Sequence, residues 1–497
     1  MTVRMLAGLA LLLGPLWGQD SSAAEPRMVD LNVVAVDDHG QPVADLTRDE
    51  LRVSDSGKAQ TIAYFHHRDA SARLLPALGP NEVSNRGKKN IPRATVILFD
   101  LLNQDFATRG TSANQLIHDL ESLETADYLY LYLLTLDGRL YPVRGLPTEQ
   151  AEADGPGGEP WTRHVKPMLN EALRATAQVR RPDIDIAVRE PITYTALERM
   201  ADELSIVPGR KNLVWVTDGV PIELGPYRSD IGDFVDFTTL LRRMSEAFER
   251  TGTAIYPVRQ VMLGSPDNVN GGSGLGSIDT LSQFAQMTGG RPDAGKDIGA
   301  AVRQAINDAR TSYQIGYYPP PKNWDDKFHK LRVTCTRKGV RIQVKNGYYG
   351  WREQPGARSE LAIESAIPPA FDAAEIGLRA TLSPDPSGAH RVRLDARIDA
   401  DDVALVHQGE RYNAQLRLAI VGYAPSAQPQ RGPTIPLDLG YNAQDRDQAL
   451  RQGINFTQDV TLQEDVRSVR LIVFDRGSDA VGSVTLPVPA FAAAQRK

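Results

Sequence analysis

ATVILFDLLN, residues 94–103, is the stretch of this sequence on which the fold prediction depends. Its residues are apolar apart from Thr95 until the run reaches Asp100. A strand that is buried on both faces of a parallel sheet has this pattern, because it has no solvent face and so no polar alternation. The C-terminal end of such a strand is where open α/β sheets bind ligands. Asp100 is therefore the first candidate site residue.

Helical and strand-like stretches alternate on the C-terminal side of this run. A second strand-like stretch, DYLYLYLLTL, covers residues 127–136, and an amphipathic helix is predicted over residues 193–207. A further buried strand, NLVWVTDG, covers residues 212–219 and reaches Asp218. TAIYPV at 253–258 and SYQIGYYP at 312–319 read as later strands. This order predicts an α/β domain with a Rossmann-like, doubly wound, mostly parallel sheet.

The composition of the flanking segments predicts the domain organisation. An early arginine, an apolar run of about a dozen residues and small residues up to Ala24 are typical of a secretory signal peptide, too short to remain as a comfortable membrane anchor. We expect export to the periplasm, the cell envelope or the medium, with no integral membrane segment after cleavage. The predicted division is a signal peptide at 1–24, a β segment at 25–68, a linker at 69–92, the α/β domain at 93–350, a second linker at 351–375 and a β sandwich of immunoglobulin-like kind at 376–490.

The net charge and the absence of catalytic motifs argue against two classes of function, nucleic-acid binding and catalysis. The formal net charge of −6 argues against a nucleic-acid partner, because phosphate binding needs a basic stripe. The sequence contains no G-x-S-x-G, H-E-x-x-H or C-x-x-C pattern, so we expect no enzyme. The pair Asp401 and Asp402 and the pair His66 and His67 are interpreted as solvated. Arg210 and Lys211 could form an anion site, but a solvated turn is the preferred interpretation.

A family resemblance rests on several of these stretches in order. They are residues 94–103, 203–219, 254–258, 280–291, 312–319 and 344–350, preceded by the β segment at 37–65. Together they resemble the VWFA-related proteins of the acidobacterial type, which carry a von Willebrand factor A-like domain. The resemblance covers most of residues 30–350, and it implies the A-type fold for the α/β domain.

The resemblance also implies a cation site. A domains hold a divalent cation with D-x-S-x-S, a threonine and a second aspartate, and Mg²⁺ suits such oxygen ligands. Asp100, Thr193 and Asp218 match the two aspartates and the threonine, whereas Leu102 and Gln104 replace the two serines. Asn103 could substitute as a ligand if the loop is reshaped. The alternative is a degenerate site whose aspartates cap helices or satisfy loop amides.

The function expected from these features is an exported protein-binding, adhesion or assembly module with an unidentified protein partner. Two alternatives stay open. One is a secreted hydrolase, and the other is a structural spacer that binds nothing.

Overall fold

The computed structural model describes residues 27–69, 77–86, 93–104, 106–123, 128–146, 162–175, 186–219, 227–228, 234–235, 238–259, 274–291, 297–352, 356–368, 372–385, 388, 390–425 and 428–489. The predicted signal peptide at 1–24 lies outside them, as does most of the predicted linker at 69–92.

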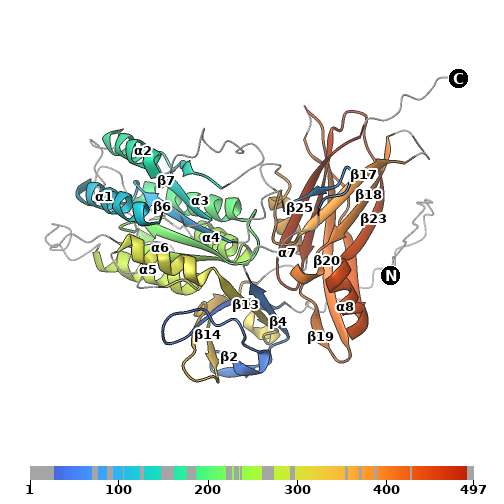
Figure 1. The fold of residues 1–497 in the computed structure, drawn as a ribbon, viewed down its shortest axis with the longest axis horizontal. Coiled ribbons are helices and arrows are strands. Elements are labelled where there is room, and N and C mark those ends of the chain that lie inside the picture. The colour runs from blue at the N-terminus through green and yellow to red at the C-terminus, as the bar shows by residue number, and fades with distance from the viewer. Residues whose placement is uncertain are drawn as a thin grey trace.

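A five-stranded mixed sheet forms the central part of the chain (Figure 1). Its strands run in the order β12 (Thr253–Val258), β9 (Lys211–Val216), β6 (Ala94–Asp100), β7 (Leu129–Leu134) and β8 (Leu140–Arg144). The first four pair in parallel, and β8 returns antiparallel to β7 as a hairpin. All residues of the four parallel strands are buried, as their continuous apolar runs require.

Two groups of helices pack against this sheet. The helices α3 (Ile186–Leu204), α4 (Thr238–Arg250) and α5 (Gly274–Thr288) share one hydrophobic core with it. The helices α1 (Phe106–Ser122), α2 (Thr162–Ala175) and α6 (Ile298–Asp308) share another. The short strands β10 (Tyr227–Arg228) and β11 (Phe234–Val235) pair with each other.

The fold class predicted from the sequence is wrong. The described part of the chain is rich in β structure, most of its strands pair antiparallel, and parallel pairing is confined to the one mixed sheet. No doubly wound parallel arrangement of the von Willebrand factor A type is evident there. The strand at 312–319, expected to continue the α/β order, leaves that sheet and pairs antiparallel with strands near the N-terminus. Local periodicity predicted the strands, but it carries no information on which distant strand completes each ladder.

An N-terminal β unit is built from residues 29–69, which precede the mixed sheet in the sequence, and from residues 311–349, which follow it. One of its sheets has the order β15 (Arg341–Gln343), β1 (Val29–Val36), β13 (Thr311–Tyr317) and β4 (Tyr64–Asp69). The other has the order β16 (Gly347–Tyr349), β14 (Phe328–Cys335), β2 (Leu51–Asp55) and β3 (Lys58–Gln60). The 3-10 turns η1 (Arg48–Glu50) and η4 (Pro321–Asn323) lie in its loops. The two sheets enclose one core, so segments that are far apart in the sequence fold together.

Two further antiparallel sheets enclose a core in the C-terminal part. The first has the order β23 (Ile454–Thr461), β18 (Arg391–Ile398), β17 (Leu378–Pro384) and β5 (Val83–Ser84). The second has β19 (Val406–Gln408), β20 (Arg411–Tyr423), β24 (Ser468–Asp475) and β25 (Val481–Pro487), with β21 (Gln430–Arg431) and β22 (Ile435–Tyr441) also on β20. The other elements are α7 (Ala357–Ser365), η5 (Ala400–Asp402) and α8 (Ala443–Gln452). Strand β5 comes from the predicted linker at 69–92.

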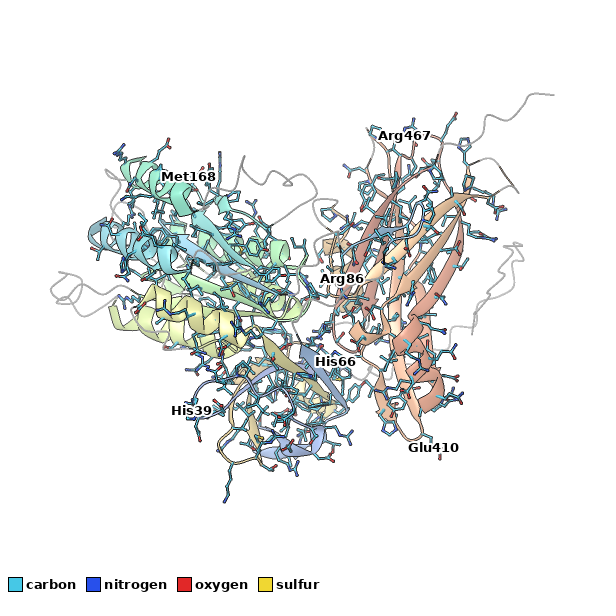
Figure 2. All side chains as sticks on the ribbon, in the orientation of Figure 1. His39, His66, Arg86, Met168, Glu410 and Arg467 are labelled. Atoms are coloured by element: carbon cyan, nitrogen blue, oxygen red, sulfur yellow. The ribbon has the colours of Figure 1, made fainter. Side chains whose placement is uncertain are left out.

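Buried ion pairs join the C-terminal sheets to the other two parts. Lys211 of β9 is fully buried, and its Nζ donates to Glu375 Oε1 at 2.8 Å. Arg68 of β4 lies 3.4 Å from Asp402 Oδ1, and Arg86, which follows β5 within the C-terminal sheets, donates to Asp402 Oδ2 at 2.7 Å. Figure 2 shows Arg86 on the side of the C-terminal sheets that faces the mixed sheet. The predictions that Lys211 and Asp402 are solvated are therefore wrong, because tertiary partners compensate the cost of burying their charges.

Among the described residues, no helix is long and apolar enough to cross a membrane.

Candidate functional site

Asp100, at the end of β6, is a fully buried hydrogen-bond acceptor. Its Oδ2 accepts from Trp215 Nε1 at 3.0 Å, from Thr217 Oγ1 at 2.9 Å and from the side-chain amide of Asn103 at 2.9 Å. Its Oδ1 accepts from the backbone N–H of Asn103 at 2.9 Å. Burial raises the pKa of Asp100, while these hydrogen bonds act in the opposite direction.

Asn103 links Asp100 to helix α3. Its amide nitrogen donates to Thr193 Oγ1 at 2.8 Å as well as to Asp100, and its Oδ1 accepts from the Arg189 guanidinium at 3.1 Å. Thr193 in turn donates to the backbone carbonyl of Arg189, one helical turn earlier, at 2.8 Å. Three of the four residues predicted for the cation site, Asp100, Asn103 and Thr193, thus lie together.

The fourth predicted residue, Asp218, is buried beyond the end of β9. Its neighbour Thr217 is the residue that reaches Asp100. Leu102 and Gln104 occupy the two positions at which the family pattern has serines. Leu102 is buried in the hydrophobic core, and Gln104 Nε2 donates to the Val216 carbonyl at 3.0 Å. Neither side chain substitutes for a serine ligand in these contacts.

The donor set around Asp100 does not fit a divalent cation. Mg²⁺ needs oxygen lone pairs that converge on one point. Here Oδ2 of Asp100 already accepts three hydrogen bonds, and the amide nitrogen of Asn103 lies between Asp100 and Thr193. The guanidinium of Arg189 adds a positive charge beside Asn103. Among the described residues, no three His, Cys, Asp or Glu side chains are grouped so as to hold a metal ion. We therefore derive no metal chemistry from this cluster.

The sequence reasoning overlooked Trp215, Thr217 and Arg189. A signal existed for Trp215, because an indole N–H in a fully buried strand needs an acceptor close by. The aspartate at the end of the neighbouring strand is such an acceptor. The roles of Thr217 and Arg189 depend on the distance between β9, α3 and the loop after β6, which the sequence pattern does not contain.

A second candidate site is a cavity of about 60 Å³ between helix α4 and the N-terminal β unit. Asp30 of β1 contributes to its lining, together with Glu249, Lys345 and the aromatic residues Tyr349 and Trp351. Lys345 Nζ donates to Glu249 Oε1 at 2.6 Å. Oδ1 of Asp30 is shielded from solvent and accepts no hydrogen bond within the described part of the chain.

An aromatic stack lies at this cavity. Trp351 and Tyr349 are stacked with ring centroids 4.8 Å apart, and Phe328 meets Tyr349 edge-on at 5.2 Å. The guanidinium of Arg242 lies 4.8 Å from the centroid of the Trp351 ring. Phe328 is 37% exposed, so the stack reaches the surface. Phe328, Tyr349, Trp351 and Arg242 are called the aromatic stack below.

Burial raises the pKa of Asp30 from 3.8 to about 7, although Lys345, Gln314 and Arg68 lower it and Asp479 raises it further. The folded chain holds the proton of this carboxyl more tightly than the unfolded chain does. The free energy of unfolding is therefore highest below the ordinary pKa of the carboxyl, and it falls as the pH rises toward the pKa in the folded chain. We therefore expect Asp30→Asn to gain stability relative to the natural chain between pH 4 and pH 7, by on the order of 3 kcal/mol. Chemical unfolding of both chains across this pH range measures the difference. A difference that does not change with pH would contradict the expectation.

No protein-family model matches the chain, and no curated protein matches it significantly. The resemblance to the VWFA-related proteins therefore stays a prediction.

Proposed function

We propose that this chain is an exported protein-binding module whose partner inserts a lysine or arginine side chain into the cavity beside Asp30. The observation that carries the proposal is Asp30, a residue of the cavity lining whose Oδ1 atom is shielded from solvent and has no hydrogen-bond partner among the described residues. A buried acceptor without a donor costs free energy, and a cationic side chain would supply the donor and the opposite charge. Support for export comes from the residue pattern at 1–24.

The size of the cavity favours a macromolecular partner over a small ligand. About 60 Å³ holds an ammonium or guanidinium group, whereas pockets for whole small ligands are several times larger. The remainder of the partner must therefore lie on the surrounding surface. That surface carries the aromatic stack, and Trp, Tyr and Arg are the residue types that most often dominate binding energy at protein interfaces.

Site-specific photo-crosslinking tests the proposal. A photoreactive residue is placed at Phe328 of the full chain, and a control is placed at Tyr141, which is 49% exposed on β8, away from the cavity. In envelope extracts we expect one protein to be crosslinked at 328 and not at 141. Binding of that purified protein should weaken about tenfold in Asp30→Asn and in Trp351→Ala. If position 328 captures nothing beyond what position 141 captures, the proposal fails.

A structural spacer is the second candidate. The buried pairs of Lys211 with Glu375 and of Arg68 with Asp402 favour it, because the first joins the mixed sheet and the second joins the N-terminal β unit to the C-terminal sheets. A spacer needs no partner at the aromatic stack. The absence of specific crosslinks at both positions would favour the spacer.

A further inference from the structure

A second pocket, of about 380 Å³, lies between the N-terminal β unit and the C-terminal sheets. On the N-terminal side it is lined by Tyr64, Phe65 and His66 of β4 and by Arg48 of η1. Figure 2 shows His66 on the β unit, toward the C-terminal sheets. The volume is that of a site for a small organic molecule. The pocket is separate from the cavity beside Asp30.

The opposite side of the pocket combines an aromatic ring with basic groups. His407 of β19 and Tyr412 of β20 have ring centroids 4.6 Å apart, and the guanidinium of Arg446 on α8 lies 4.6 Å from the Tyr412 centroid. Asp401 of η5 is an acidic group of the lining, with Oδ1 4.0 Å from Nδ1 of His66. The lining thus holds two arginines and two histidines against a single carboxylate.

The ion pairs of the two arginines are weak, although Arg446 also lies over the Tyr412 ring. Arg48 lies 3.8 Å from its neighbour Asp49, whose side chain is 91% exposed. Arg446 lies 3.5 Å from its neighbour Asp447, whose side chain is 55% exposed. Exposed pairs between sequence neighbours contribute little, so both guanidinium groups can be recruited by a ligand at small cost. An anion between them would gain charge-assisted hydrogen bonds from both sides of the pocket.

We propose that this pocket binds a small organic anion that carries a phosphate or carboxylate group on a ring. The arginines take the anionic group, and the rings of Tyr412 and His407 take the flat body of the ligand by stacking. The site goes beyond the proposed protein binding and does not depend on it.

His66 supplies an internal reporter for such a ligand. Burial lowers the pKa of His66 to about 4, and the positive charges of Arg68 and His67 contribute to the decrease. The carboxylates of Asp401 and Asp402 raise this pKa but do not offset the decrease. An anion in the pocket favours the protonated ring, so binding should raise the pKa of His66 and take up protons between pH 4 and 6.5.

The experiment measures binding of phenyl phosphate, inorganic phosphate and benzylamine to the full chain by calorimetry. We expect phenyl phosphate to bind at least about tenfold more tightly than benzylamine and more tightly than inorganic phosphate. The double variant Arg48→Gln/Arg446→Gln should lose at least about tenfold in affinity for phenyl phosphate. Arg451→Gln, an exposed position on the same helix, should lose none.

A shift of the His66 ring resonances on adding phenyl phosphate to the natural chain is the second readout, and it does not require the double variant to fold. If inorganic phosphate binds as tightly as phenyl phosphate, the pocket recognises only the anionic group. That result would overturn the proposed stacking of the ligand's ring on Tyr412 and His407. The proposal is overturned if benzylamine binds as tightly as phenyl phosphate. It is also overturned if the double variant folds and keeps the affinity of the natural chain for phenyl phosphate. A third contrary result is no saturable binding of phenyl phosphate together with unchanged His66 resonances.

Discussion

Asp100→Ala is expected to lower the free energy of unfolding of the central part of the chain by about 4 kcal/mol. The substitution removes the acceptor of four hydrogen bonds and leaves the indole N–H of Trp215 and the backbone N–H of Asn103 buried without a partner. Each buried donor without an acceptor costs about 1–3 kcal/mol. Denaturant unfolding followed by tryptophan fluorescence and circular dichroism measures the loss. Asp137→Ala is the matched control, because this side chain is 57% exposed on the turn between β7 and β8.

The same pair of chains separates a structural role of Asp100 from a cation site. A ligand that binds only the folded state raises the melting temperature. Because the donor set does not fit a cation, we expect Mg²⁺, Mn²⁺ and Ca²⁺ to leave the melting temperature of the natural chain unchanged. A rise with one of these ions that disappears in Asp100→Ala would contradict the structural role and support the cation site predicted from the sequence.

Lys211→Met is expected to cost about 3–5 kcal/mol, because it leaves the carboxylate of Glu375 in a buried position without its cation. Burial lowers the pKa of Lys211, and the partner Glu375 acts against that change. Replacing both residues, as in Lys211→Met/Glu375→Leu, should recover most of the loss, since an apolar pair needs no compensation of charge. A double-mutant cycle on denaturant unfolding gives the coupling free energy, which we expect to exceed about 1 kcal/mol.

The control for this cycle is the pair of Arg393 and Asp459, whose atoms lie 2.9 Å apart but whose side chains are 52% and 35% exposed. Solvent screens such a pair, so its coupling should be below about 1 kcal/mol. Equal coupling at the two pairs would show that Lys211 and Glu375 do not form a buried junction in solution.

Some features of the candidate sites could be predicted from the sequence. Asp100 was predicted as a site residue because it ends a buried strand, and the C-terminal ends of such strands are where open α/β sheets bind ligands. The meeting of Asp100 with Thr193 was expected from the family resemblance, and hydrogen bonds to Asn103 bring the two residues together. The two pockets could not be predicted, because each is lined by residues of segments far apart in the chain, such as His66 with Tyr412 or Asp30 with Trp351.

The sequence by itself determined many of the local elements: the buried runs at 94–99, 211–216 and 253–258 are strands, and residues 376–490, predicted as a β sandwich, form mainly β strands within the described part. Only the tertiary structure decided that β13 joins the N-terminal unit, that β5 joins the C-terminal sheets and that Lys211 and Asp402 are buried. The physical reason is the range of the interactions. Periodicity reports which face of a segment avoids water, whereas strand pairing and charge compensation depend on partners that the fold brings from hundreds of residues away.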